Sequence, residues 1–133
     1  MSVELLNCDC MEYMATQPDN AFDLAIVDPP YGIGDFSMKT SGGNCGKPVF
    51  KKWDYKWNTS IPEKEYFAEL YRVSKNSVIW GANYLNCFSA LGGAIVWNKH
   101  NEHPNMSQCE IASVSVNKIV KYIDMPWLGF ITL

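Results

Sequence analysis

The chain has 133 residues, 47% hydrophobic and 19% charged, which is an ordinary composition for one globular domain. It holds no apolar run of the roughly 18 residues that a membrane helix needs and no signal-peptide pattern, so we expect a cytoplasmic protein with no membrane partner. Its five cysteines are scattered without a C-x-x-C pair, so we expect neither a disulfide framework nor a metal site. A self-sufficient DNA-binding domain usually carries net positive charge, whereas this chain carries −3.

The N-terminal residues predict a strand followed by a helix. Val3–Leu6 is a short apolar run. Asp9 has the side chain of a helix N-cap, and the helix that it would start covers Cys10–Thr16. The polar residues 17–20, which include a proline, predict the turn that ends this helix.

A second strand and a long loop come next. Leu24–Val27 is a continuous apolar run, typical of a strand buried on both faces of a parallel sheet, and Asp28 follows where it ends. Residues 32–60 are rich in glycine and show no helical or strand period, so they predict a loop. Loops of this length are uncommon unless they bind something or are disordered, and this one begins directly after Tyr31.

A helix is predicted after this loop. Ser60 is the expected N-cap, Pro62 lies in the first turn, and Asn76 is the expected stop. The apolar residues of this segment fall on one helical face: Tyr66, Phe67, Leu70, Tyr71 and Val73.

Four strands are predicted in the rest of the chain. Ser77–Trp80 and Ala94–Trp97 are strands with a short helix between them that ends by Ser89. Ile111–Val116 and Ile119–Ile123 are two further strands whose tight connection suggests a hairpin. The alternation of strands and helices predicts an α/β sheet with mostly parallel strands, in which ligands gather at the carboxyl ends of the strands.

The tetrapeptide Asp28-Pro29-Pro30-Tyr31 lies at such an end and has a chemical interpretation. The lone pair of an exocyclic amine such as adenine N6 is delocalised into the ring, so a catalyst must make the nitrogen more tetrahedral. The Asp28 carboxylate and the Pro29 carbonyl could accept the two amino hydrogens and stabilise the developing positive charge. The two prolines stiffen this corner, and the Tyr31 ring offers a face on which an extruded base can stack.

These residues give the chain its resemblance to the DNA adenine methyltransferases, in particular phage and bacterial members with the permuted beta order of motifs. The resemblance covers about residues 3–123. It is carried by Asn7–Met11, Phe22–Gly34, Arg72–Lys75, Ile79–Tyr84 and Ile95–Lys99, of which the second segment is highly specific.

The resemblance implies a Rossmann-like sheet, S-adenosylmethionine as the methyl donor and DNA as the partner. It assigns catalysis to residues 28–31 and donor contacts to Asp9, Cys10 and Asp28, although Asp9 has a simpler interpretation as a helix cap. Methylation of cytosine N4 or of RNA stays an alternative. So does a non-catalytic remnant that only binds nucleic acid.

One family feature is missing from this chain. Such enzymes carry a glycine-rich turn, Phe-x-Gly-x-Gly, that holds the methionine part of the donor, and no segment here matches it. Residues 1–123 are therefore expected to form an incomplete catalytic domain that lacks the donor-binding half, and residues 124–133 an apolar tail that suggests truncation. An incomplete sheet has an open edge, so a homo-oligomer or a second chain that supplies the other half is expected.

Two further sets of residues are candidates for binding. Residues 35–60 hold five lysines against two acids, and DNA contacts are expected in this segment. The residues chosen for this role are Lys47, Lys51, Lys52, Trp53 and Lys56. Asn83 could face the donor pocket, and Glu110 is an acid within an apolar strand, where an edge position or a pairing with a lysine is the simpler explanation.

Overall fold

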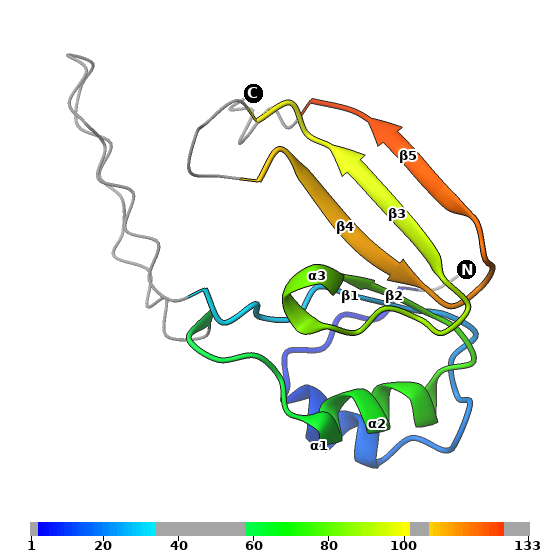
Figure 1. The fold of residues 1–133 in the computed structure, drawn as a ribbon. Helices are drawn as coiled ribbons and strands as arrows, with labels where there is room; N and C mark the ends of the chain where they lie inside the picture. The colour runs from blue at the N-terminus through cyan, green and yellow to red at the C-terminus, as the bar shows by residue number, and fades with distance from the viewer. Residues whose placement is uncertain (1–2, 34–57, 102–106, 127–133) are drawn as a thin grey trace.

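The computed structural model of the protein describes residues 3–33, 58–101 and 107–126. Its elements are, in chain order, α1 (Cys10–Ala15), β1 (Ala25–Val27), α2 (Lys64–Val73), β2 (Ser77–Trp80), α3 (Ala82–Leu85), β3 (Gly93–Asn98), β4 (Cys109–Val114) and β5 (Val120–Asp124). Helices and strands alternate as far as β3, so the expected α/β class agrees with the structure (Figure 1). No helix of the described ranges is long and apolar enough to cross a membrane.

The five strands form one mixed sheet in the order β1-β2-β4-β3-β5. β1 pairs with β2 and β3 pairs with β5 in parallel, whereas β4 runs antiparallel to both of its neighbours, β2 and β3. The other four strands therefore share one direction. Because β4 lies between β2 and β3, two of the four strand pairings in the described sheet are antiparallel, so the sheet is mixed rather than mostly parallel as predicted.

The predicted hairpin between the last two strands is wrong. β4 and β5 do not pair with each other, because β3 lies between them (Figure 1). The connection between them crosses the start of β3, where the carbonyl oxygen of Asn117 approaches Gly93 so closely that a Cβ there would lie 2.0 Å from it. A glycine at this position permits the crossing, which a tight two-residue connection in the sequence does not reveal.

The predicted strand Val3–Leu6 and the predicted two-sided burial of the next strand are also wrong in this structure. Val3 and Leu5 are 87% and 90% exposed, and no strand forms there. β1 lies at the edge of the described sheet and pairs only with β2, and Ile26 at its centre is 65% exposed. A short apolar run forms a strand only where a neighbouring strand offers free backbone groups, and none is placed beside Val3–Leu6.

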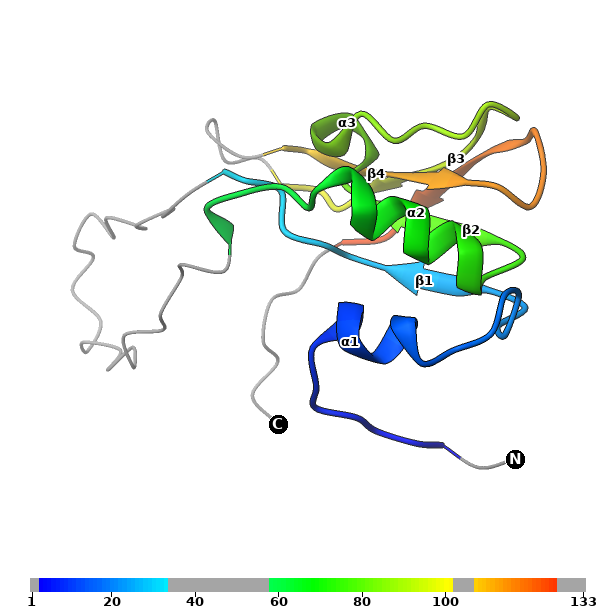
Figure 2. The ribbon, with the colours of Figure 1, turned by 90° about the horizontal axis from the view of Figure 1, so that it is seen from below.

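α1 and α2 lie side by side on one face of the sheet, as Figures 1 and 2 both show. α1 starts as predicted, because the Asp9 carboxylate accepts hydrogen bonds from the amides of Met11 and Glu12. The core forms where the two helices meet β2 and α3. Its buried members are Met14, Leu70, Val73, Ile79 and Leu85.

α2 begins later than the sequence predicts. Its N-cap is Glu63, without a side-chain hydrogen bond, rather than Ser60. Pro62 disfavours a helical conformation at the residue before it, so the chain stays non-helical until after the proline. The helix ends at Val73, where the buried hydroxyl of Ser74 donates to the Leu70 carbonyl oxygen at 2.5 Å.

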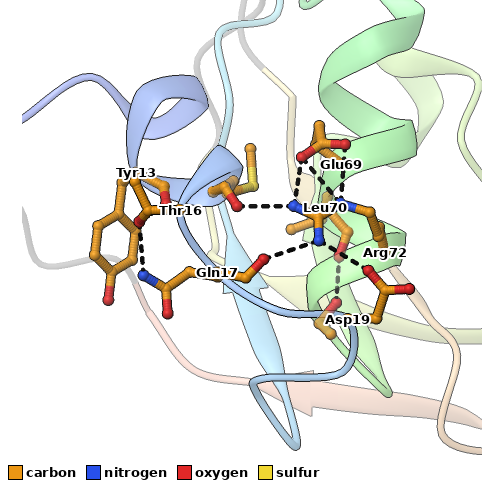
Figure 3. Close-up of polar contacts among 9 residues, drawn as sticks. Tyr13, Thr16, Gln17, Asp19, Glu69, Leu70 and Arg72 are labelled. Atoms are coloured by element: carbon orange, nitrogen blue, oxygen red, sulfur yellow. Dashed lines mark hydrogen bonds and ion pairs between the residues drawn. The ribbon is translucent and has the colours of Figure 1, made fainter.

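The Arg72 guanidinium joins the two helices (Figure 3). It donates to the carbonyl oxygens of Met14 and Gln17 at 2.8 and 2.9 Å, at the end of α1 and in the turn after it. It also forms ion pairs with Glu69 at 2.7 Å and Asp19 at 2.9 Å. The hydrogen bond from Arg72 is the main reason why the pKa of Glu69 lies below its ordinary value. The planar, five-donor fork of arginine makes this combination of partners possible, and lysine could not reproduce it.

We predict that Arg72→Met lowers the melting temperature by roughly 5 °C or more, because it removes the donors that join α1 to α2. Lys75→Met is the matched control: within the described residues its ion pair is with Asp23, and both side chains are largely exposed, at 54% and 91%. Exposed pairs contribute little, so the control should melt close to the unmodified chain. Equal melting temperatures for the two variants in a thermal scan would contradict this role of Arg72.

Candidate active site

The parallel pairing of β1 and β2 brings two chain segments together at one edge of the sheet. Asp28 follows β1 directly, and Gly81 follows β2 directly. In parallel strands the carboxyl ends lie at the same edge, so residues 28–31 and 81–84 are neighbours although about 50 positions separate them in the sequence. The predicted catalytic tetrapeptide therefore lies at the strand end where the sequence places it, beside a second segment.

Tyr31 is held at three points within this edge. Its hydroxyl donates a hydrogen bond to the Asp28 carboxylate. Its amide donates to the side-chain oxygen of Asn58 at 2.7 Å, which also accepts from the amide of Gly32 at 3.2 Å. Its ring stacks on that of Tyr84, with 5.1 Å between the centroids and 19° between the planes. The tyrosine is thus placed by both local and distant partners.

Gly81 makes room for the Tyr31 ring. A Cβ at this position would lie 2.0 Å from Cε1 of the ring, which is far inside van der Waals contact. Gly81 also has φ +71, in the left-handed region that favours glycine. Sequence reasoning identified neither Gly81, Asn58 nor Tyr84 as a site residue; the available signal was the position of Gly81–Tyr84 directly after a predicted strand.

The pKa of Tyr31 lies well above its ordinary value, first because the side chain is partly buried and second because its hydroxyl contacts Asp28. The hydroxyl therefore keeps its proton at neutral pH and acts as a donor. One Asp28 carboxylate oxygen is engaged by this hydroxyl. An amine that used the same oxygen as an acceptor would compete with the Tyr31 hydroxyl for it.

A cavity of about 620 Å³ adjoins the tetrapeptide. Its lining joins the start of α1 to the strand end and to the chain before α2. From α1 and the strand end it includes Cys10, Met11, Val27, Asp28, Pro29 and Pro30, and from the chain before α2 and its first turn Ser60, Ile61, Pro62, Glu63, Glu65 and Tyr66. Two of the three residues expected to touch a donor, Cys10 and Asp28, thus line one cavity.

The third of these residues, Asp9, does not line the cavity. Its carboxylate caps α1 instead, with hydrogen bonds of 2.8 and 3.1 Å to the amides of Met11 and Glu12. The simpler interpretation of Asp9 as a helix cap therefore accounts for its position.

The remaining candidates of the described chain, Glu110 and Asn83, do not line the cavity. Glu110 forms an ion pair with Lys99, and both side chains are largely buried, at 22% and 16% exposure. This is the pairing with a lysine that the sequence left open. The negative charge of Glu110 is also one of the smaller causes that raise the pKa of Tyr31. Asn83 is exposed and does not line the cavity.

The residues expected to contact DNA lie outside the described residues. They are Lys47, Lys51, Lys52, Trp53 and Lys56, and their role stays a prediction. Within the described ranges, no group of three or more His, Cys, Asp or Glu side chains is placed so that it could hold a metal ion.

The chain is similar to type II methyltransferases. M2.DpnII of Streptococcus pneumoniae is 24% identical over 119 residues, which cover 77% of this chain and 44% of that protein. M.HinfI of Haemophilus influenzae is 28% identical over 119 residues, which cover 76% of this chain and 33% of that protein. The chain thus spans less than half the length of these relatives. No family model matches it, and no solved structure gives a significant match.

The approach of Tyr31 to Gly81 can be tested with a pair of glycine variants. Gly81→Ala should lower the free energy of unfolding by roughly 1–3 kcal/mol from backbone strain alone, and by more because the new Cβ must displace the Tyr31 ring. Gly92→Ala is the control, because Gly92 has a similar φ of +76 but nothing lies within 4 Å of its Cβ position. Urea unfolding measures both. Equal losses of stability would mean that the ring does not pack against Gly81.

Proposed function

We propose that this chain forms the catalytic part of an S-adenosylmethionine-dependent DNA methyltransferase that acts on adenine N6, with a Rossmann-like sheet. The observation that carries the proposal is the position of Asp28-Pro29-Pro30-Tyr31 at the carboxyl end of β1, where three of its residues line the cavity. Similarity to two type II methyltransferases supports it. Because the chain spans less than half the length of either relative, activity of this chain alone is part of the proposal.

The cavity has the character that the donor requires. Met11, Val27 and Ile61 supply apolar walls, and carboxylates of Asp28 and Glu63 lie in the lining. S-adenosylmethionine, which supplies the methyl group as part of a positively charged sulfonium ion, combines apolar surface with positive charge. The lining therefore suits this donor in both respects, with Cys10 and Asp28 among the contacts.

The chemical role of the tetrapeptide follows from its acceptors. The Asp28 carboxylate and the Pro29 carbonyl oxygen accept the two hydrogens of the target amine, which makes its nitrogen more tetrahedral and more nucleophilic. As the new nitrogen–carbon bond forms and the sulfur–carbon bond breaks, positive charge develops on the nitrogen, and the displaced proton passes to Asp28 or to water. Asp28 must exchange the Tyr31 hydroxyl for the amine, or share the two.

We predict that Asp28→Ala lowers methyl transfer by at least about 100-fold, because it removes one of the two acceptors of the amine. The assay incubates the purified chain with labelled S-adenosylmethionine and unmethylated bacterial DNA, and then identifies the labelled nucleoside. Asp23→Ala is the control, because this carboxylate is 91% exposed and, in the part of the chain that the structure describes, forms its ion pair with Lys75. Label in N4-methylcytosine, or in RNA offered in parallel, would replace the adenine assignment.

Donor binding separates the enzyme from a non-catalytic nucleic-acid-binding module. In a calorimetric titration of the same chain, binding of S-adenosylmethionine at micromolar concentration is the expected result. A folded chain that binds DNA but neither binds the donor nor transfers methyl groups would contradict the proposal and favour the binding module.

The outer edge of β1 is proposed as the place where a second chain adds to the sheet. β1 pairs only with β2 within the described sheet, and two exposed apolar residues lie in it or directly before it, Ile26 and Leu24. Free strand edges beside apolar surface favour pairing with another chain. In the purified protein, the chain that adds at this edge is a second copy of the same protein. A polypeptide that carries the donor-binding half would pair with the same edge.

We expect sedimentation velocity at micromolar concentration to show association of the purified chain. Ile26→Lys should shift the chain towards the monomer, since a charge at this 65% exposed position opposes burial of the edge. Lys118→Met, on the connection between β4 and β5 and therefore away from β1, serves as the control. A compact monomer of the unmodified chain would contradict the proposed pairing.

A further inference from the structure

Tyr84 is fixed at both of its ends. Its amide donates to the Gly81 carbonyl oxygen at 2.9 Å in the first turn of α3. Its hydroxyl shares a hydrogen bond of 2.9 Å with the hydroxyl of Ser107, before β4. Between these two points its ring stacks on Tyr31. The side chain is 39% exposed, so it lies at the surface of the site rather than in the core.

We propose that Tyr84 is a positioning residue for the target base: it holds the plane of the Tyr31 ring so that the opposite ring face receives the extruded base. This inference rests on the proposed methyltransferase function. It assigns a role in base binding to a residue outside the tetrapeptide, contributed by the strand end next to it in the sheet.

The hydrogen-bond arrangement of Tyr31 gives the reason. In the structure, the Tyr31 hydroxyl is anchored on Asp28. When Asp28 accepts a hydrogen from the target amine, this anchor weakens, and the ring is then held by the Tyr84 stack and by its contact with Gly81. The stack is therefore most important in the complex in which the base must be aligned.

Stacking on a tyrosine depends on the orientation of its ring, because bases and aromatic rings prefer offset parallel planes. A Tyr31 ring free to rotate about its side-chain bonds would lose part of its stacking energy as rotational entropy. An aromatic pair contributes about 0.5–1.5 kcal/mol beyond its buried area, which corresponds to roughly 2- to 12-fold in an equilibrium constant.

Two variants separate the ring of Tyr84 from its hydroxyl. Tyr84→Leu removes the stack, and Tyr84→Phe keeps the ring but removes the hydrogen bond to Ser107. We expect Tyr84→Leu to raise the KM for DNA by roughly 2- to 12-fold with a smaller change in kcat, and Tyr84→Phe to restore a KM close to that of the unmodified chain. Circular dichroism and thermal melting establish that both variants are folded.

A second measurement uses the protein without DNA. With tyrosine rings labelled with ¹³C, the ring signals of Tyr31, assigned through Tyr31→Phe, should shift in Tyr84→Leu and stay nearly unchanged in Tyr84→Phe. Unchanged Tyr31 signals in a folded Tyr84→Leu variant, or an unchanged KM in an active one, would overturn the proposal. If the unmodified chain transfers no methyl group, the proposed function fails, and the ring signals still decide whether Tyr84 holds Tyr31.

Discussion

The parallel ladder between β1 and β2 is the interaction on which the site depends. It pairs Ala25 with Ser77 and Val27 with Ile79, so both strands end at the same edge of the sheet. Ile79 is 1% exposed and belongs to the core, which ties the ladder to the packing of the helices beneath it. Every contact between the tetrapeptide and the segment after β2 follows from this register.

The helices support that ladder in two ways. Leu70 and Val73 of α2 pack against the sheet, and the carbonyl oxygen of Val73 accepts a hydrogen bond from the amide of Phe22. Arg72, from the same turn of α2, secures α1 through the carbonyl oxygens at its end. Residues of α1 then form one wall of the cavity, so the polar network around Arg72 positions part of the proposed donor site.

Several features of the fold could be predicted from local sequence. The Asp9 cap and the span of β2 were predicted correctly, because a cap depends on residues within one helical turn and β2 is a short apolar run between turn residues. The start of α2 and the pairing of β4 were not. The first depends on the backbone around Pro62, and the second on a crossing that requires Gly93 to lie beneath Asn117.

The sequence by itself determined the stiff corner Asp28-Pro29-Pro30-Tyr31 and its place at the end of an apolar strand, because the constraints that prolines impose act on the same and the preceding residue. Only the tertiary structure decided what surrounds Tyr31. Its partners Asn58, Gly81 and Tyr84 lie 27 or more positions further along the chain, and Gly81 and Tyr84 reach it because β1 and β2 pair in parallel. Contacts of this kind depend on register and crossing geometry, which no local pattern encodes.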